Sequence, residues 1–374
     1  MALQASQLVR DLSQFLTPTI PVLDSDYDGL ELSWKIFVFR PALFKYEPFL
    51  LAAVLFYGAF FWFGSRMNRS KANTWLSAHM GIFKKQFSRP TAAGGDGIVD
   101  LTSDGYSDFF AFSTGRSTIA SLHTVFALRP RHDFFQLAVQ FGWGLVDLLY
   151  TPKDEVTLDF KLHATAGVPE FVWALVVRGE ANSIKKERWD LTFTKTTENP
   201  QLPPNVVIMS EYADVTENVL KIAGPVLEAL KDPKIQPYFR SLSITDQPRV
   251  RPMIVSSKKA KHVILSLAVP PPSRIDVSTR LLSALFGLID ALEKVNLRPE
   301  TKSKIKKTRE NFAKTLKDEA EREAREEAAE AKLAAKRRAE EERIASLSAA
   351  EQQKLLERDR KRNLRKTQGK IVKK

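Results

Sequence analysis

The feature that most constrains this chain is an uncharged apolar run of eighteen residues, Pro48–Ser65 (PFLLAAVLFYGAFFWFGS). At 1.5 Å per residue, a helix over this run is about 27 Å long, close to the hydrocarbon thickness of a thin bilayer. Nine of its residues are Leu, Val or Phe, and together they favour insertion by about 3–5 kcal/mol. A helix in the core of a soluble domain normally carries a polar stripe, which this run lacks. We therefore predict a transmembrane helix over residues 48–65.

The charges on either side of the run predict its orientation. Residues 65–92 carry six basic and no acidic side chains, whereas residues 1–47 carry four basic and six acidic ones. Because Lys and Arg are retained on the cytosolic side, the short segment 1–47 is expected in the lumen and the rest in the cytosol. The run fits the thin membrane of the endoplasmic reticulum better than a thicker plasma membrane. Residues 1–20 lack a basic region followed by an apolar core, so we expect no cleavable signal peptide.

Residues 66–96 are predicted to form a basic juxtamembrane helix and a linker. Its lysines and arginines would meet anionic headgroups while its apolar side chains lie along the interface. The stretch 90–97 (PTAAGGDG) breaks the pattern and marks a domain boundary. The expected interface residues are Arg66, Arg69, Lys71, Trp75, Lys84 and Lys85.

Residues 97–298 alternate β-rich runs with apolar helical segments, which predicts a mixed α/β domain in the cytosol and an α+β fold class overall. The segment Phe134–Tyr150 carries one charge, Asp147, and two glutamines, so a buried helix of the domain is favoured over a second span. A membrane-facing groove for a partner is the intermediate alternative. The expected strands are Phe109–Ser113, Glu155–His163, Phe171–Val177, Trp189–Thr194, Val206–Ser210 and His262–Val269. The expected helices are Ser117–Ala127, Phe134–Tyr150, Val215–Leu230 and Ser278–Val295.

Several kinds of chemistry find no support in the sequence. There is no cysteine, which excludes disulfides, thiol nucleophiles and cysteine-ligated metals. The five histidines lack metal-ligand spacing, and no phosphate-binding loop or nucleophile elbow is present, so we predict no catalytic residues, no cofactor and no enzyme activity. An acidic turn with Asp24, Asp26, Asp28 and Glu31 resembles half of a calcium-binding loop. Lys35 occupies the position of the closing glutamate, so this turn is at most a weak metal site.

The basic character of the chain is concentrated at its end. Residues 301–374 carry 24 basic and 14 acidic side chains, against a net charge of +13 for the whole chain. The segment 299–374 is predicted to be a long, charged helical tail, and a solvated single helix is favoured over a coiled-coil dimer. Its last part combines ten basic with two acidic residues, which is typical either of a solvated face or of binding to phosphate backbones. The candidate RNA-binding residues are Lys354, Arg358, Arg360, Lys361, Arg362, Arg365, Lys366, Lys370, Lys373 and Lys374.

The order of these parts, together with residues 114–133 (TGRSTIASLHTVFALRPRHD) and 347–357 (LSAAEQQKLLE), resembles the calumin-like family. This family is the coiled-coil-containing subunit of the PAT complex, the protein complex associated with the endoplasmic-reticulum translocon. The resemblance covers residues 30–374. It implies a lumenal amino terminus, one membrane helix, a cytosolic α/β domain, and a tail that contacts ribosomal RNA.

The resemblance also implies partners and a function. The partners would be the ribosome, the Sec translocation channel, a small multipass protein called Asterix, and transmembrane segments of client proteins. The implied function is assistance in the insertion and folding of multipass membrane proteins. The segment 1–47 is less acidic than in animal members, so the calcium binding attributed to some of them rests here on the half-loop alone. A calcium-handling membrane protein and a membrane tether with a lipid-binding tail are the alternatives.

Overall fold

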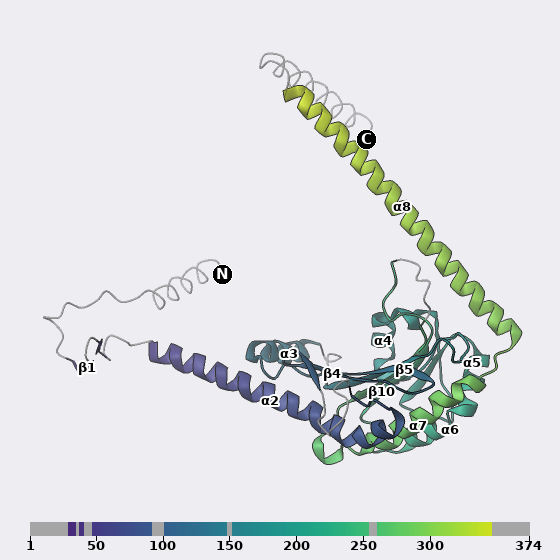
Figure 1. Ribbon diagram of the computed structural model, residues 1–374, viewed down its shortest axis with the longest axis horizontal. Coiled ribbons are helices and arrows are strands. Elements are labelled where there is room, and N and C mark those ends of the chain that lie inside the picture. The colour runs from purple at the N-terminus through teal and green to yellow at the C-terminus, as the bar shows by residue number, and fades with distance from the viewer. Residues whose placement is uncertain are drawn as a thin grey trace. The chain divides into compact units, whose positions relative to one another are not determined.

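The computed structural model describes residues 29–34, 37–40, 47–91, 101–147, 152–253 and 260–345. Its contacts divide the chain into two compact units. The first contains residues 1–247 and 260–296, and the second contains residues 248–259 and 297–374. The described part has the mixed α/β composition expected, with one long apolar helix before the sheet and one long helix after it (Figure 1).

The first unit is built on a nine-stranded antiparallel sheet with the order β3-β4-β5-β6-β11-β10-β7-β9-β8. A separate hairpin pairs β1 (Leu32–Trp34) with β2 (Phe37–Phe39). The strands of the large sheet are β3 (Thr102–Asp104), β4 (Asp108–Ser113), β5 (Ile119–Ala127), β6 (Glu155–Leu162), β7 (Trp173–Val177), β8 (Lys195–Thr197), β9 (Val206–Ser210), β10 (Phe239–Thr245) and β11 (His262–Ala268).

Several α-helices accompany the sheet in the described part of the first unit. They are α2 (Glu47–Gln86), α3 (Phe134–Val146), α4 (Ala181–Glu187), α5 (Ala213–Ile222), α6 (Gly224–Lys231) and α7 (Val277–Ala291). Short 3-10 turns are η3 (Arg178–Glu180), η4 (Trp189–Phe193), η5 (Pro272–Arg274) and η6 (Leu292–Lys294).

The two faces of the sheet are covered unequally. One face packs on α2 and α7, where Phe126 of β5 meets Trp75 and Phe160 of β6 meets Phe286. On the other face, α4 and η4 cover β7 and β9 with a cluster that includes Ile184 and Leu191. The same face is more open over β4, β5 and β6, where burial alternates along the strands and Phe110 and Val125 are each 38% exposed. Figure 1 shows α4 on the side of the sheet opposite α6 and α7.

Three of the predicted elements differ in type or number from the observed ones, each for a physical reason. The segment 117–127 is mostly the strand β5, because Leu122, Thr124 and Phe126 alternate toward the core with a period of two. The expected strand at 189–194 is the 3-10 turn η4, where buried Asp190 pairs with the neighbouring Arg188 at 2.6 Å. The expected single helix at 215–230 is two helices, since Pro225 has no N–H to continue the first one.

The second unit consists of the described loop 248–253 and the helix α8 (Pro299–Ala345). Arg251 of the loop pairs with Glu319 of the helix at 2.7 Å. Two apolar side chains of the helix, Ile305 and Leu316, are buried. Beyond Leu316 the described side chains are almost all exposed, with helix-stabilising pairs such as Glu321–Arg325 at 3.5 Å.

Candidate membrane anchor and its junction with the sheet domain

The helix α2 has two halves with opposite surroundings: an outer half up to Phe63, which is mostly exposed, and an inner half from Gly64 onward, which packs on the sheet domain. In its most apolar eighteen-residue window only 6% of the residues are buried, and Phe49, Val54 and Phe63 are each at least 65% exposed. It is the one helix among the described residues that is long and apolar enough to cross a membrane. A core helix would bury this surface, because exposed apolar area in water is costly. The outer half therefore has the properties of a membrane anchor.

The inner half of α2 belongs to the core of the sheet domain. Its buried residues recur at helical spacing along one stripe: Gly64, Asn68, Ala72, Trp75, Leu76, His79 and Phe83. The helix runs from Glu47 to Gln86 without interruption, so anchor and domain share one rigid element. The sequence separates these residues into a span and a juxtamembrane helix, whereas the structure joins them.

Gly64 marks the point where α2 passes from exposure to burial. A Cβ atom added here would lie 2.0 Å from the carbonyl oxygen of Arg131 and 2.7 Å from the amide nitrogen of His132. Since both of these are backbone atoms, only glycine allows α2 to approach the loop before α3 so closely. Gly58, in the exposed half of the helix, has nothing within 4 Å of the position that a Cβ atom would occupy.

Next to Gly64, a polar cluster fastens α2 to the loops at the edge of the sheet. The Asn68 amide donates hydrogen bonds to the carbonyls of Tyr106 and Arg129, each at 3.0 Å, and its oxygen accepts one from Arg131 at 3.0 Å. Arg131 grips the carboxylate of Asp154 with two bonds of 2.8 and 2.7 Å, and Lys71 pairs with the same carboxylate. The Asp154 side chain is only 7% exposed, so the cluster is a buried ion network.

The environment of Asp154 fixes its charge. Burial would by itself raise the pKa of this carboxyl group, but hydrogen bonds from Arg131, the Arg129 N–H and Lys71 lower the pKa well below its ordinary value. The carboxylate is therefore ionised at all physiological pH values, as two neighbouring cations require. The cluster joins the first turns of α2 beyond the apolar run to the loop before α3 and to the start of β6.

The six residues expected at the membrane interface divide into two groups. Arg66, Arg69, Lys84 and Lys85 are exposed, so their contact with headgroups stays a prediction. Lys71 instead pairs with Asp154. Trp75 is fully buried, stacked on His79 at 4.0 Å and against Phe126, so the prediction that it lies at the interface is wrong.

Trp75 is buried because it lies on the face of α2 that packs on the sheet, and the helical spacing of the apolar residues around it could have shown this face. Trp75, Leu76, His79 and Phe83 form a stripe that packs on the sheet. The Nδ1–H group of His79 donates a hydrogen bond to the Trp75 carbonyl, and its Nε2 atom is hydrogen-bonded to the hydroxyl of Ser278, each at 2.8 Å. Burial lowers the pKa of His79, which keeps the ring neutral inside this core.

The remaining predicted site residues lie mostly outside the described residues. This holds for all ten cations from Lys354 to Lys374 and for Asp24, Asp26 and Asp28. Glu31 is described and pairs with Arg40 at 3.5 Å. Within the described ranges, no group of three or more His, Asp or Glu side chains is placed to hold a metal ion.

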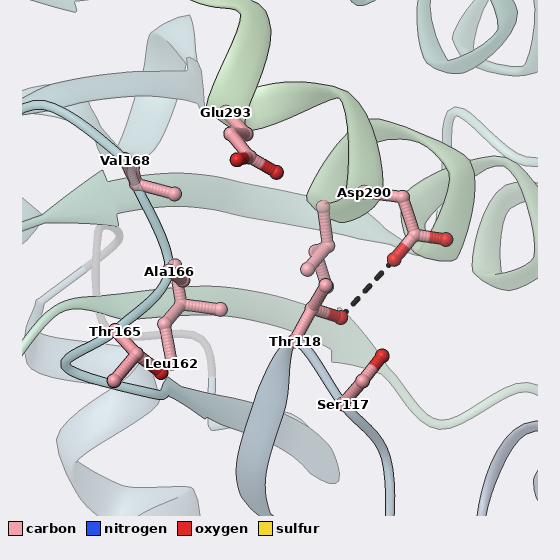
Figure 2. A pocket seen from close by; sticks show the side chains of 9 residues that line it. Ser117, Thr118, Leu162, Thr165, Ala166, Val168, Asp290 and Glu293 are labelled. Atoms are coloured by element: carbon pink, nitrogen blue, oxygen red, sulfur yellow. Dashed lines mark hydrogen bonds between the residues drawn. The ribbon is translucent and has the colours of Figure 1, made fainter.

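A cavity of about 190 Å³ lies where β5 begins and α7 ends (Figure 2). Its wall includes Glu293 and Asp290, and Asp290 accepts a hydrogen bond from Thr118 at 3.1 Å and pairs with Arg116 at 2.5 Å. The volume is below the range of about 300–1,000 Å³ usual for small-molecule sites. Because Asp290 is already bonded to these two residues, its role is structural: it joins the segment before β5 to the end of α7.

Comparison with known proteins agrees with an anchored architecture. The family model described as PAT complex subunit CCDC47 matches residues 43–366. A Schizosaccharomyces pombe protein described as a UPF0674 endoplasmic reticulum membrane protein is 25% identical over 281 residues, 71% of this chain and 73% of the relative. A Saccharomyces cerevisiae protein with the same description is 22% identical over 224 residues, 54% of this chain and 55% of that relative.

Proposed function

The chain belongs to the family of PAT complex subunit CCDC47, and from that membership we propose that it is a membrane-insertion factor of the endoplasmic reticulum. In this proposal it associates with the translating ribosome and the Sec translocation channel. Together with a small multipass partner, Asterix, it would assist the insertion and folding of multipass membrane proteins. The family is not an enzyme family, and we propose no catalytic role.

The observation that carries the proposal is the division of α2 into an exposed apolar half and a half fixed in the sheet domain. A domain held this way cannot rotate freely about its anchor, because the buried ion network and Gly64 lock the helix to two loops. Such a scaffold would hold its surfaces at a constant height and angle relative to the bilayer. That is what a subunit working beside a membrane channel requires.

The tail supplies the proposed contact with the ribosome. At 1.5 Å per residue, the 47 residues of α8 form a rod about 70 Å long, and most of it after Leu316 is exposed. In the sequence, the basic cluster from Lys354 to Lys374 follows this rod. Ten cations without interleaved aromatic residues are suited to phosphate backbones, whose counterions they would release, and not to reading bases.

Removing the basic cluster should abolish this contact. We expect truncation after Gln353 to leave membrane integration intact but to remove salt-sensitive cosedimentation with ribosomes. The reason is that each phosphate contact steepens the fall of the logarithm of the binding constant with the logarithm of the salt concentration by about 0.7–0.9. The measurement is cosedimentation of the full-length and truncated proteins with ribosomes over a series of salt concentrations.

The matched control substitutes glutamine for exposed cations of α8 itself, Lys332, Lys336 and Arg338, and should keep ribosome binding. Unchanged cosedimentation of the truncated protein would refute the role of the tail. Binding of the tail to anionic liposomes in place of ribosomes would favour the tether alternative. Calorimetry with calcium on a peptide of residues 20–47 tests the calcium alternative.

A further inference from the structure

The helix α3 has the surface expected for lipid and not for a domain core. It has thirteen residues, none of them charged and none buried. Among the most exposed are Phe135, Val139, Phe141, Leu145 and Val146, each at 58–78%. This contradicts the expected buried helix over residues 134–150. That expectation took for granted that an apolar helix in this domain is covered by the domain.

The covered side of α3 is narrow and includes a polar residue. Gln140 is half-buried, and Leu137 and Gly144, one turn to either side, are also partly covered by the protein. At 100° per residue, the exposed positions fill an arc of roughly 200°. A partner helix contacts a narrow ridge, whereas fluid lipid chains cover a wide arc of this kind.

The start of α3 packs on the exposed half of α2. The ring of Phe134 lies 6.2 Å from that of Phe56 and 5.5 Å from that of Phe60, in edge-on geometry, and Phe135 lies 5.9 Å from Tyr57. Phe56 and Phe60 precede Arg66 by about six to ten residues, or about 9–15 Å along the helix axis. If α2 spans the bilayer, the start of α3 therefore lies inside the hydrocarbon layer, deeper than the headgroups.

The N-terminal end of α3 is capped within the chain. Asp133 caps the helix by accepting hydrogen bonds from the N–H groups of Phe135 and Gln136, at 3.0 and 3.1 Å. Inside a bilayer, backbone donors that find no partner in the chain are costly, so a capped helix is required. Thirteen residues span about 20 Å, too short to cross a hydrocarbon core of about 30 Å.

We infer that α3 is a second membrane element, a monotopic helix embedded in the leaflet nearest the sheet domain, with its aromatic and aliphatic side chains against lipid acyl chains. The inference rests on the proposed anchor, because the depth of α3 is measured along α2. Two insertions at one end would fix the tilt of the sheet domain relative to the bilayer more firmly than the attachment through the inner half of α2 does by itself. The exposed surfaces of α2 and α3 then form one continuous lipid-facing patch.

The absence of cysteine makes the test direct, since one introduced thiol is the only site for a fluorescent label. Phe141→Cys and Leu145→Cys probe α3, Leu55→Cys probes the anchor, and Val125→Cys on the open sheet face serves as the exposed control. Each labelled full-length protein is reconstituted into phosphatidylcholine vesicles with or without brominated acyl chains. Quenching by the bromine and by aqueous iodide is then compared.

We expect the labels on α3 to be quenched by bromine and protected from iodide, as at Leu55, while the label at Val125 shows the reverse. Quenching at Leu55 by bromine together with quenching of α3 by iodide would overturn the inference and leave the anchor standing. Protection of α3 from both quenchers would also overturn it, since a protein surface then covers the helix. Iodide quenching at Leu55 itself would show that the anchor, and with it the proposed function, has failed.

Discussion

Arginine at both Leu51 and Leu55 should release the protein from the membrane. The two leucines are 61% and 64% exposed in the outer half of α2, so their replacement disturbs no packing within the protein. The change at Leu55, near the middle of the run, costs about 3–4 kcal/mol on the insertion scale, and the change at Leu51, nearer its end, adds a smaller cost. Together they offset the roughly 3–5 kcal/mol that favours insertion of the run. The measurement is the fraction of protein that alkaline carbonate extracts from microsomes.

The control for this experiment keeps the apolar character of both sites. A variant with Leu51→Ile and Leu55→Ile should stay in the membrane pellet, because isoleucine inserts about as well as leucine. If the double arginine variant also remained in the pellet at the wild-type level, the apolar half of α2 would not be the anchor.

Replacing Asp154 by alanine should produce the largest loss of folding stability from a single substitution. The change leaves Arg131 and Lys71, with side chains 19% and 21% exposed, without their shared carboxylate. Removing one partner from a buried charge network typically costs about 3–5 kcal/mol. We expect this decrease in the free energy of unfolding, measured by urea titration of the detergent-solubilised protein with tryptophan fluorescence as the signal.

An exposed ion pair provides the comparison. Glu198 pairs with Arg178 at 2.9 Å, but the two side chains are 70% and 53% exposed. Replacing Glu198 by alanine should cost less than about 1 kcal/mol, since solvent screens such pairs. Equal effects of the two substitutions would show that Asp154 does not fasten α2 to the sheet domain.

The pH dependence of stability should change in the same Asp154→Ala variant. Because the pKa of Asp154 is lowered in the folded protein, the folded state binds this proton less tightly than the unfolded chain does. The contribution of Asp154 is complete above the unfolded pKa of about 3.9 and is lost as the pH falls toward the folded value. Below about pH 4 the wild type should therefore lose stability more steeply than the alanine variant.

What the sequence could predict follows from which signals are local. The apolar run 48–65 and the helical tail are read from composition alone, and five of the six expected strands overlap observed ones because their β-branched and aromatic residues alternate or cluster between turns. The family was also accessible from residues 114–133, which include Arg131 of the ion network.

The parts that escaped prediction depend on partners distant in sequence. From the sequence, Lys71 is a typical ligand for lipid headgroups. Its actual partner, Asp154, lies 83 residues later in the chain, so the pairing is visible only in the structure. Likewise, a tryptophan in a basic helix beside an apolar run is typical of a membrane interface. Only the packing of Phe126 against Trp75 shows that this residue belongs to the core. For α3 the error was the reverse, because a helix predicted to be buried is exposed. Its burial depends on whether neighbouring elements cover it, and no pattern within residues 134–150 encodes their positions.

The most direct test of the proposed function is the placement of the chain across the membrane. An epitope is placed after Lys374 in the full-length protein, and sealed microsomes are treated with protease, with and without detergent. We predict that the epitope is digested without detergent, while a fragment containing residues 1–47 and the apolar half of α2 is protected. An epitope that survives until detergent is added would put the basic tail in the lumen, where no ribosome can reach it, and would contradict the proposed function.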